Sequence, residues 1–89
     1  FARQVEALAR PGDLLIIHTT SGNSPNLIRA AEAAKAKNVP VLAMSARDGG
    51  KLRAVATHSV IIPTDRTDRA QELQLCIQHI ICDIVEREL

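Results

Sequence analysis

The sequence predicts an α/β domain with a three-layer α/β/α architecture, in which a parallel sheet lies between helices. Three short aliphatic runs, at 14–17, 41–45 and 59–62, have the length of buried strands. Segments with helical spacing separate these runs, and crossovers of this length favour parallel strands with helices packed on the faces. The core is expected to be aliphatic, because Phe1 is the only aromatic residue.

The first half of the chain is expected to form a helix, a strand and a second helix. The first helix is expected over 1–10 and ends at a Pro-Gly pair. The strand over 13–18 follows, and its uninterrupted apolar run predicts that both faces are covered. The second helix, over 24–37, begins where the hydroxyl of Ser24 is expected to cap a free N–H and a proline occupies the first helical position.

The second half adds two strands and two helices. In order, we expect a strand over 41–45, a turn over 48–50, a short helix over 51–56, a strand over 59–62 and a final helix ending near Leu89. Asp65 or Thr67 is expected to cap the final helix. Three strands make a thin sheet for this architecture, so one edge is expected to be where a missing first half belongs.

Charge and composition exclude several classes of partner. The chain has 11 basic and 10 acidic residues, no basic block and one aromatic residue, so we expect no nucleic-acid partner. No apolar run approaches the roughly 20 residues of a membrane span, so we expect no membrane insertion. Cys76 and Cys82 cannot bridge within one helix and are expected to be core residues in a reducing compartment. Phe1 is not a natural start, so the natural N-terminus is expected upstream.

Four hydroxyls within six residues follow the first strand, on Thr19, Thr20, Ser21 and Ser24. They lie where a parallel sheet binds ligands, beyond the carboxyl end of a strand and at the start of a helix. The unpaired N–H groups of a helix start favour an anion. With no lysine in the loop, this arrangement suits a phosphate monoester on a small molecule. The alternative is an ordinary turn whose hydroxyls only cap the helix, although capping needs one hydroxyl and not four.

The final helix has apolar residues on two sides. One stripe consists of Leu73, Ile77, Ile80 and Ile84, widened by Cys76 and Ile81, and the opposite side holds Gln71, Leu75, His79, Cys82 and Glu86. We expect one face to pack on the sheet and the other to meet a missing segment or another subunit.

Two interpretations of His79 stay open at this point. It is either a core histidine bonded to a backbone carbonyl, or a metal ligand or acid–base group, because imidazole exchanges protons near neutral pH. Gln71 lies about 12 Å before it along the helix axis, so one ion contacts both only if the side chains lean together. His18 and His58 have no partner at ligand spacing and are expected to face solvent or to cap.

Three motifs together resemble the phosphoheptose isomerases, which belong to the sugar isomerase (SIS) superfamily. They are the hydroxyl run Thr19-Thr20-Ser21-Gly22-Asn23-Ser24, the turn Asp48-Gly49-Gly50-Lys51, and Gln71-Glu72 with His79 eight residues beyond Gln71. The hydroxyl run alone marks only the superfamily, whereas its combination with the Gln and His of the final helix is more specific. The resemblance covers essentially all of residues 1–89 and implies a single SIS-type, flavodoxin-like domain of which this chain is the C-terminal half.

The resemblance implies an isomerase that converts D-sedoheptulose 7-phosphate to D-glycero-D-manno-heptose 7-phosphate through an enediol, supplying heptose for bacterial lipopolysaccharide and other surface polysaccharide. It also implies a cytoplasmic homotetramer with a sugar-phosphate substrate and one zinc ion per subunit. The residues that would hold the phosphate are Thr19, Thr20, Ser21 and Ser24; Gln71 would contact the sugar or the metal; and His79 would be a zinc ligand and the catalytic acid–base group.

Three departures from the family pattern are visible. Thr19 stands where a Ser is usual, Gln74 replaces a second His that many members carry, and His18 is bulkier than the usual small residue. The family's glutamate base, remaining metal ligands and Asn-Gly substrate loop lie in the N-terminal half, so the segment alone is expected to be inactive. Two alternatives stay open: a non-catalytic SIS protein that binds the replication initiator, which lacks the histidine found here at position 79, and a sugar-phosphate sensor, which would normally carry a DNA-binding module.

Overall fold

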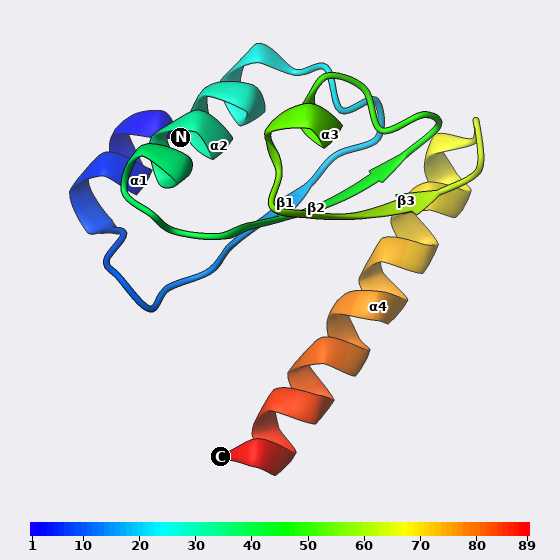
Figure 1. Cartoon of the computed structure of the whole chain (residues 1–89). Helices are drawn as coiled ribbons and strands as arrows, with labels where there is room; N and C mark the ends of the chain where they lie inside the picture. Colours follow the sequence, from blue (N-terminus) through cyan, green and yellow to red (C-terminus); the bar gives the residue numbers. More distant parts are fainter.

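A computed structural model describes all of residues 1–89 as an alternation of helices and strands (Figure 1). The elements are α1 (Ala2–Leu8), β1 (Leu15–His18), α2 (Pro25–Ala36), β2 (Val41–Ala46), α3 (Leu52–Val55), β3 (His58–Ile62) and α4 (Thr67–Glu88). This is the order predicted from the sequence. Asn38, shortly after the second helix, has a φ of 60°, the left-handed conformation that often ends a helix.

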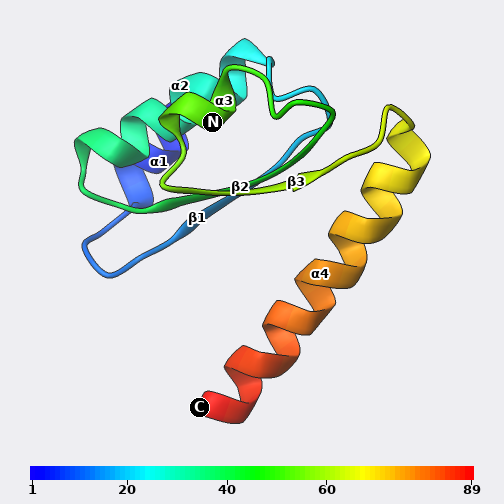
Figure 2. The same cartoon turned by 45° about the vertical axis from the view of Figure 1, so that its right-hand side comes forward.

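The three strands form one parallel sheet in the order β1-β2-β3. Ile17 is opposite Ala43, and Ser45 is opposite Ile61. The helices α1, α2 and α3 lie on one side of the sheet, and α4 lies on the other (Figures 1 and 2). The predicted α/β class with a parallel sheet between helices is therefore confirmed.

The core lies between the central strand β2 and helices α1 to α3. Five of the six residues of β2 are buried, because this strand has a neighbour on each edge. The face of α2 that packs on the sheet consists of alanines, and Ala31 and Ala34 are fully buried. Such small side chains let the helix lie close to the strands. Val5 of α1, which packs beside α2, belongs to the same buried cluster.

The prediction that the first strand is covered on both faces is wrong. Ile17 is 4% exposed, whereas its neighbour Ile16 is 37% exposed. Successive side chains of a strand point to opposite faces, and within this chain only the face beneath α1 and α2 is covered at β1. A continuous apolar run therefore does not reveal which of its faces this chain itself buries.

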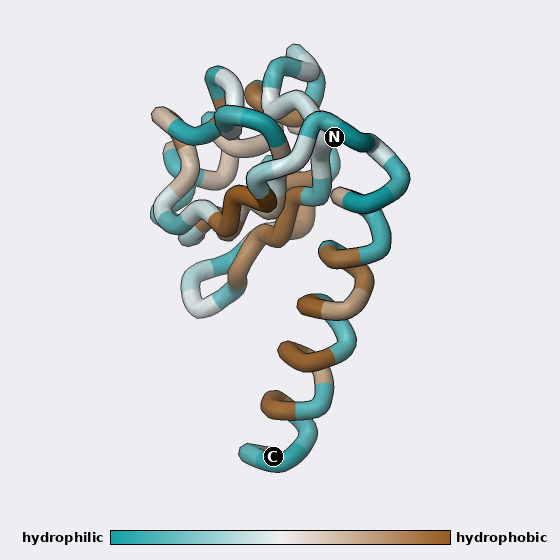
Figure 3. The backbone as a smooth tube through the Cα atoms, turned by 90° about the vertical axis from the view of Figure 1, so that its right-hand side faces the viewer, coloured by the Kyte–Doolittle hydropathy of each residue, from teal (hydrophilic) through white to brown (hydrophobic).

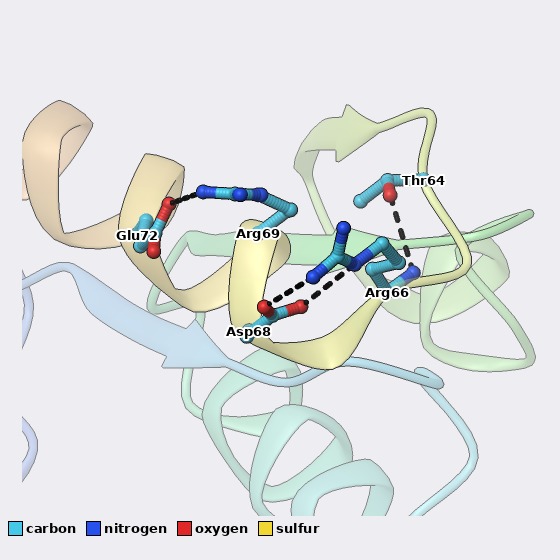
Figure 4. Close-up of polar contacts among 5 residues, drawn as sticks. All are labelled: Thr64, Arg66, Asp68, Arg69 and Glu72. Carbon is cyan, nitrogen blue, oxygen red and sulfur yellow. Dashed lines mark hydrogen bonds and ion pairs between the residues drawn. The ribbon is translucent and has the colours of Figure 1, made fainter.

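Both predicted helix caps differ from the structure. Ser24 occupies the N-cap position of α2, but its hydroxyl accepts no bond from the helix. The N-cap of α4 is Arg66, not Asp65 or Thr67. The Arg66 guanidinium instead donates two hydrogen bonds to the carboxylate of Asp68, from Nε at 3.2 Å and from Nη2 at 2.8 Å (Figure 4).

Helix α4 leaves the sheet at its first turns and extends away from the rest of the chain (Figure 2). Only Ala70 and Gln74 of this helix are buried. The prediction that one apolar face of this helix packs on the sheet is wrong for this chain, because residues on both sides, among them Leu73, Leu75 and Ile80, remain about half exposed. Figure 3 shows apolar segments along the whole helix, and the turns toward the C-terminus lie beyond the body of the domain.

The two cysteines are also not core residues within this chain. Cys76 and Cys82 are both exposed and both free, as expected for thiols that cannot bridge each other. No helix of the chain has the length and apolar character needed to cross a membrane.

Candidate functional site

The hydroxyl-rich loop over 19–24 continues directly from β1 at the carboxyl edge of the sheet. Its first residues extend the pairing with β2. Thr19 donates its N–H to the carbonyl of Met44 at 2.9 Å, and the carbonyl of Thr20 accepts the N–H of Ala46 at 2.9 Å. The loop therefore begins from a strand end that is paired with its neighbour, at the edge where open parallel sheets bind their ligands.

Two of the four loop hydroxyls shape the loop itself. Oγ1 of Thr19 accepts the N–H of Gly22 at 3.2 Å, and Oγ of Ser21 accepts the N–H of Asn23 at 3.1 Å. Thr19 is 9% exposed, so its hydroxyl is largely removed from solvent. The interpretation of the loop as an ordinary turn is therefore partly right, although these two hydroxyls stabilise the turn and do not cap the helix.

The other two hydroxyls make no hydrogen bond within the chain. They belong to Thr20 and Ser24, whose side chains are half-buried. The backbone N–H groups of Thr20, Ser21 and Ser24 likewise have no acceptor in the chain. These donors lie in the loop that leads into the 12-residue helix α2, and Ser24 is the N-cap of that helix, whose N-terminal end carries a partial positive charge. The arrangement suits an anion with several oxygens.

The Asp48-Gly49-Gly50-Lys51 turn packs against the hydroxyl loop and hydrogen-bonds to it. The N–H of Lys51 donates to Oδ1 of Asn23 at 2.9 Å, and the N–H of Leu52 donates to the carbonyl of Gly22 at 2.9 Å. A Cβ on Gly22 would overlap the carbonyl of Gly49, and Gly22 has a φ of 72°. The two segments therefore approach at a distance that only glycine permits.

A polar cavity of about 580 Å³ opens beside the loop. It is lined by Ser21 and Asn23 of the loop, Arg47 and Asp48 after β2, and Pro63, Thr64 and Asp65 after β3. Ser21 is the only one of the four predicted phosphate ligands in this lining. Arg47 is the one cation of the lining, and its side chain makes no ion pair or hydrogen bond in the chain.

The structure places His79 and Gln71 on α4, away from this cavity. Both side chains are exposed, so the interpretation of His79 as a core histidine is wrong for this chain. His79 lines a separate open depression of about 460 Å³ on the helix surface, together with Glu72 and Asp83 among others. This chain alone therefore does not bring the imidazole together with the hydroxyl loop.

The chain alone also does not form a metal centre. No group of three or more His, Cys, Asp or Glu side chains is arranged to hold a metal ion. Protein zinc sites use at least three protein ligands, whereas Gln71 and His79 supply two at most. His18 and His58 are exposed at the ends of β1 and β3, as predicted for residues without a ligand partner.

Sequence reasoning missed the part that Gln74 plays. This side chain is 5% exposed, and its Nε2 donates to the carbonyls of Thr19 at 2.7 Å and Met44 at 3.3 Å. The sequence feature that could have indicated its burial is its position one turn after Ala70, on the same face of the final helix. A polar residue at a buried helical position needs partners, and here the ends of β1 and β2 provide them.

Comparison with known proteins identifies the family. The family model described as SIS domain matches residues 1–46, which is half of the chain. This chain belongs to the SIS domain family. The predicted resemblance to phosphoheptose isomerases is also confirmed. Phosphoheptose isomerases of Akkermansia muciniphila and Citrifermentans bemidjiense are 42% and 48% identical to this SIS chain over 89 residues.

The SIS chain spans about half the length of the curated relatives that it matches, since those 89 residues cover 47% and 46% of the two relatives. The solved structure of a phosphoheptose isomerase from Francisella tularensis shares 34% identity and a TM-score of 0.93 with it, over 98% of this chain and 49% of that one. The corresponding structure from Neisseria gonorrhoeae shares 41% identity and a TM-score of 0.92, over 96% and 49%.

Proposed function

We propose that this chain is the C-terminal half of a phosphoheptose isomerase, which interconverts D-sedoheptulose 7-phosphate and D-glycero-D-manno-heptose 7-phosphate. The observation that carries the proposal is the set of free donors in the loop that leads into α2. Two hydroxyls and three N–H groups of the loop over 19–24 have no acceptor in the chain. The similarity to proteins named phosphoheptose isomerase, at 42% to 48% identity, supports the same substrate class.

In this proposal the loop anchors the phosphate of the sugar. Thr20 and Ser24 contribute free hydroxyls and the backbone contributes N–H groups, whereas the hydroxyls of Thr19 and Ser21 also hold the loop in shape. A phosphate dianion is stabilised at the positive end of a helix. Each hydrogen bond donated to the dianion is charge-assisted and therefore stronger than one between neutral groups. Binding energy at the phosphate orients the carbonyl end of the sugar, where the reaction takes place.

Moving a carbonyl between C1 and C2 requires a base that removes one proton and an acid that serves the oxygens of the enediol. We assign the acid–base role in this half to His79 and sugar contact to Gln71. Both lie on the exposed surface of α4, so the site is completed by residues outside this chain, from the rest of the protein or from a second copy. The half-exposed apolar residues along α4 support assembly, and we propose a homotetramer.

We further propose that the complete protein binds one zinc ion per subunit with Gln71 and His79 among the ligands. The two residues of this chain do not by themselves fit a zinc centre, so the remaining ligands must come from elsewhere. Metal analysis of the full-length protein and of its His79→Ala variant tests this directly, since loss of a ligand lowers the zinc content. A cytoplasmic location and a role in lipopolysaccharide heptose supply complete the proposal; the free thiols of Cys76 and Cys82 suit a reducing compartment.

An isomerase assay on the full-length protein tests the proposal. We expect conversion of sedoheptulose 7-phosphate and no conversion of sedoheptulose without phosphate, because the anchor then has no ligand. Absence of turnover with retained sugar-phosphate binding would instead indicate a sensor. Absence of both would leave the protein-binding SIS relative as the explanation.

A further inference from the structure

Gln74 is the only side chain of α4 that hydrogen-bonds to another element of the fold. Its buried amide donates from Nε2 to the carbonyl of Thr19 at 2.7 Å and to the carbonyl of Met44 at 3.3 Å. The other side-chain hydrogen bonds and ion pairs of α4 are local ones on its exposed surface, such as that between Arg69 and Glu72 (Figure 4). We propose that Gln74 is a positioning residue, which fixes the helix carrying Gln71 and His79 against the hydroxyl loop.

The two acceptors lie where the sheet becomes the loop. The carbonyl of Met44 also accepts the N–H of Thr19 at 2.9 Å, so the Gln74 amide joins the hydrogen bond by which the start of the loop pairs with β2. Thr19 is the first residue of the loop, and its hydroxyl accepts the N–H of Gly22 at 3.2 Å. A series of hydrogen bonds therefore runs from α4 through Thr19 to the turn of the loop.

Little else holds α4 at this angle within the chain. Ala70 and Gln74 are its only buried residues, and the helix diverges from the sheet beyond them (Figure 2). Gln71 lies three residues before Gln74 and His79 five residues after it, on one continuous helix. A change at Gln74 therefore moves both proposed active-site groups together, relative to the loop proposed to hold the phosphate.

The chemistry of glutamine matches this place. Its NH₂ group has two hydrogens, one for each carbonyl, and no charge to bury. Methionine has nearly the same length and volume but cannot donate, whereas histidine can donate one hydrogen bond. Asparagine keeps the amide but is one methylene shorter, so it cannot reach both carbonyls from the same backbone.

The inference rests on the proposed isomerase function, and it predicts a specific kinetic signature. Without the amide, the loop keeps its own donors, so the phosphate still binds. The distance between the anchored sugar and His79 changes, and misplacement by about 1 Å costs about 100-fold in rate. In the full-length protein, Gln74→Met should lower kcat by about tenfold or more and change KM by less than about threefold.

Gln78→Met is the matched control. Gln78 lies one turn further along α4 and is exposed, and its side chain makes no hydrogen bond within the chain, so its substitution should leave kcat and KM unchanged. Gln74→His should recover most of the lost kcat, because it restores one donor. Gln74→Asn is the second variant, and it decides the kinetic test if Gln74→Met does not fold.

A second readout does not depend on catalysis. Hydrogen exchange of the backbone amides of residues 19–24 should be faster in Gln74→Met than in wild type, and unchanged in Gln78→Met. If the wild-type protein does not isomerise the sugar phosphate, the proposed function fails, and exchange alone then decides the coupling. Equal exchange in the two variants, or a lower melting temperature of Gln74→Met with wild-type kcat, would overturn the inference.

Discussion

Replacement of Gly22 by alanine tests whether the hydroxyl loop and the Asp48–Lys51 turn support each other. At Gly22, φ is 72°, and a Cβ would overlap the carbonyl of Gly49. Gly12 is a natural control, because it has a φ of 94° and no atom within 4 Å of the position that a Cβ would take. Both substitutions incur the backbone cost of a left-handed alanine, about 1–2 kcal/mol, but only Gly22→Ala forces the two segments apart.

The additional cost at Gly22 follows from the hydrogen bonds that join the segments. The carbonyl of Gly22 accepts the N–H of Leu52, and the side chain of Asn23 accepts the N–H of Lys51. Each such bond contributes about 0.5–1.5 kcal/mol, so separation adds about 1–3 kcal/mol to the strain. Gly22→Ala should therefore lower the free energy of unfolding by about 2–5 kcal/mol, against about 1–2 kcal/mol for Gly12→Ala.

Urea unfolding of the full-length protein and the two variants, followed by circular dichroism, measures this difference. The same proteins should be tested for phosphate binding, which Gly22→Ala should weaken and Gly12→Ala should not. Equal destabilisation by the two substitutions would refute the reasoning, because the close approach at Gly49 would then contribute nothing.

The remaining predictions concern substitutions of the loop hydroxyls, of a surface ion pair and of a core alanine. Thr20→Val and Ser24→Ala should raise the KM for a sugar phosphate with little change in melting temperature, since neither hydroxyl has a partner in the chain. Thr19→Val should destabilise the fold by about 1 kcal/mol in urea unfolding, because it removes the acceptor of a buried N–H. Arg69→Ala should cost less than about 1 kcal/mol by the same measurement, because its ion pair is 55% exposed at the arginine. Ala31→Leu should cost about 1–3 kcal/mol through overpacking, since Ala31 is 0% exposed between α2 and the sheet, and a melting temperature equal to wild type would contradict this.

The order of elements was predictable because each strand is a separate aliphatic run. Turn residues bound these runs, and Pro25 and Asn38 mark the two ends of α2. The loop could also be predicted, because four hydroxyls cluster between a strand and a helix. The sequence could not predict which of these hydroxyls bond within the loop and which remain free. Only the path of the backbone decides that Thr19 and Ser21 face the turn while Thr20 and Ser24 remain free.

The final helix was the least predictable element. Its periodicity identified apolar sides, but the strip that contacts the sheet is centred on Ala70 and Gln74, between the two predicted faces. A small residue and an amide carry little hydrophobic signal, so the contact could not be seen in the pattern. Within these 89 residues His79 lies apart from the loop, on the surface of α4. The sequence alone therefore does not show how the two come together, and the proposed function relies on residues outside this chain to complete the site.

The central claim is that the hydroxyl loop holds the phosphate while the imidazole of α4 carries out proton transfer. The most direct test measures turnover and sugar-phosphate binding together in the full-length His79→Ala protein, using calorimetry for the dissociation constant. We expect turnover to be abolished while the sugar phosphate binds nearly as well as to wild type. Substantial turnover in His79→Ala would contradict this claim.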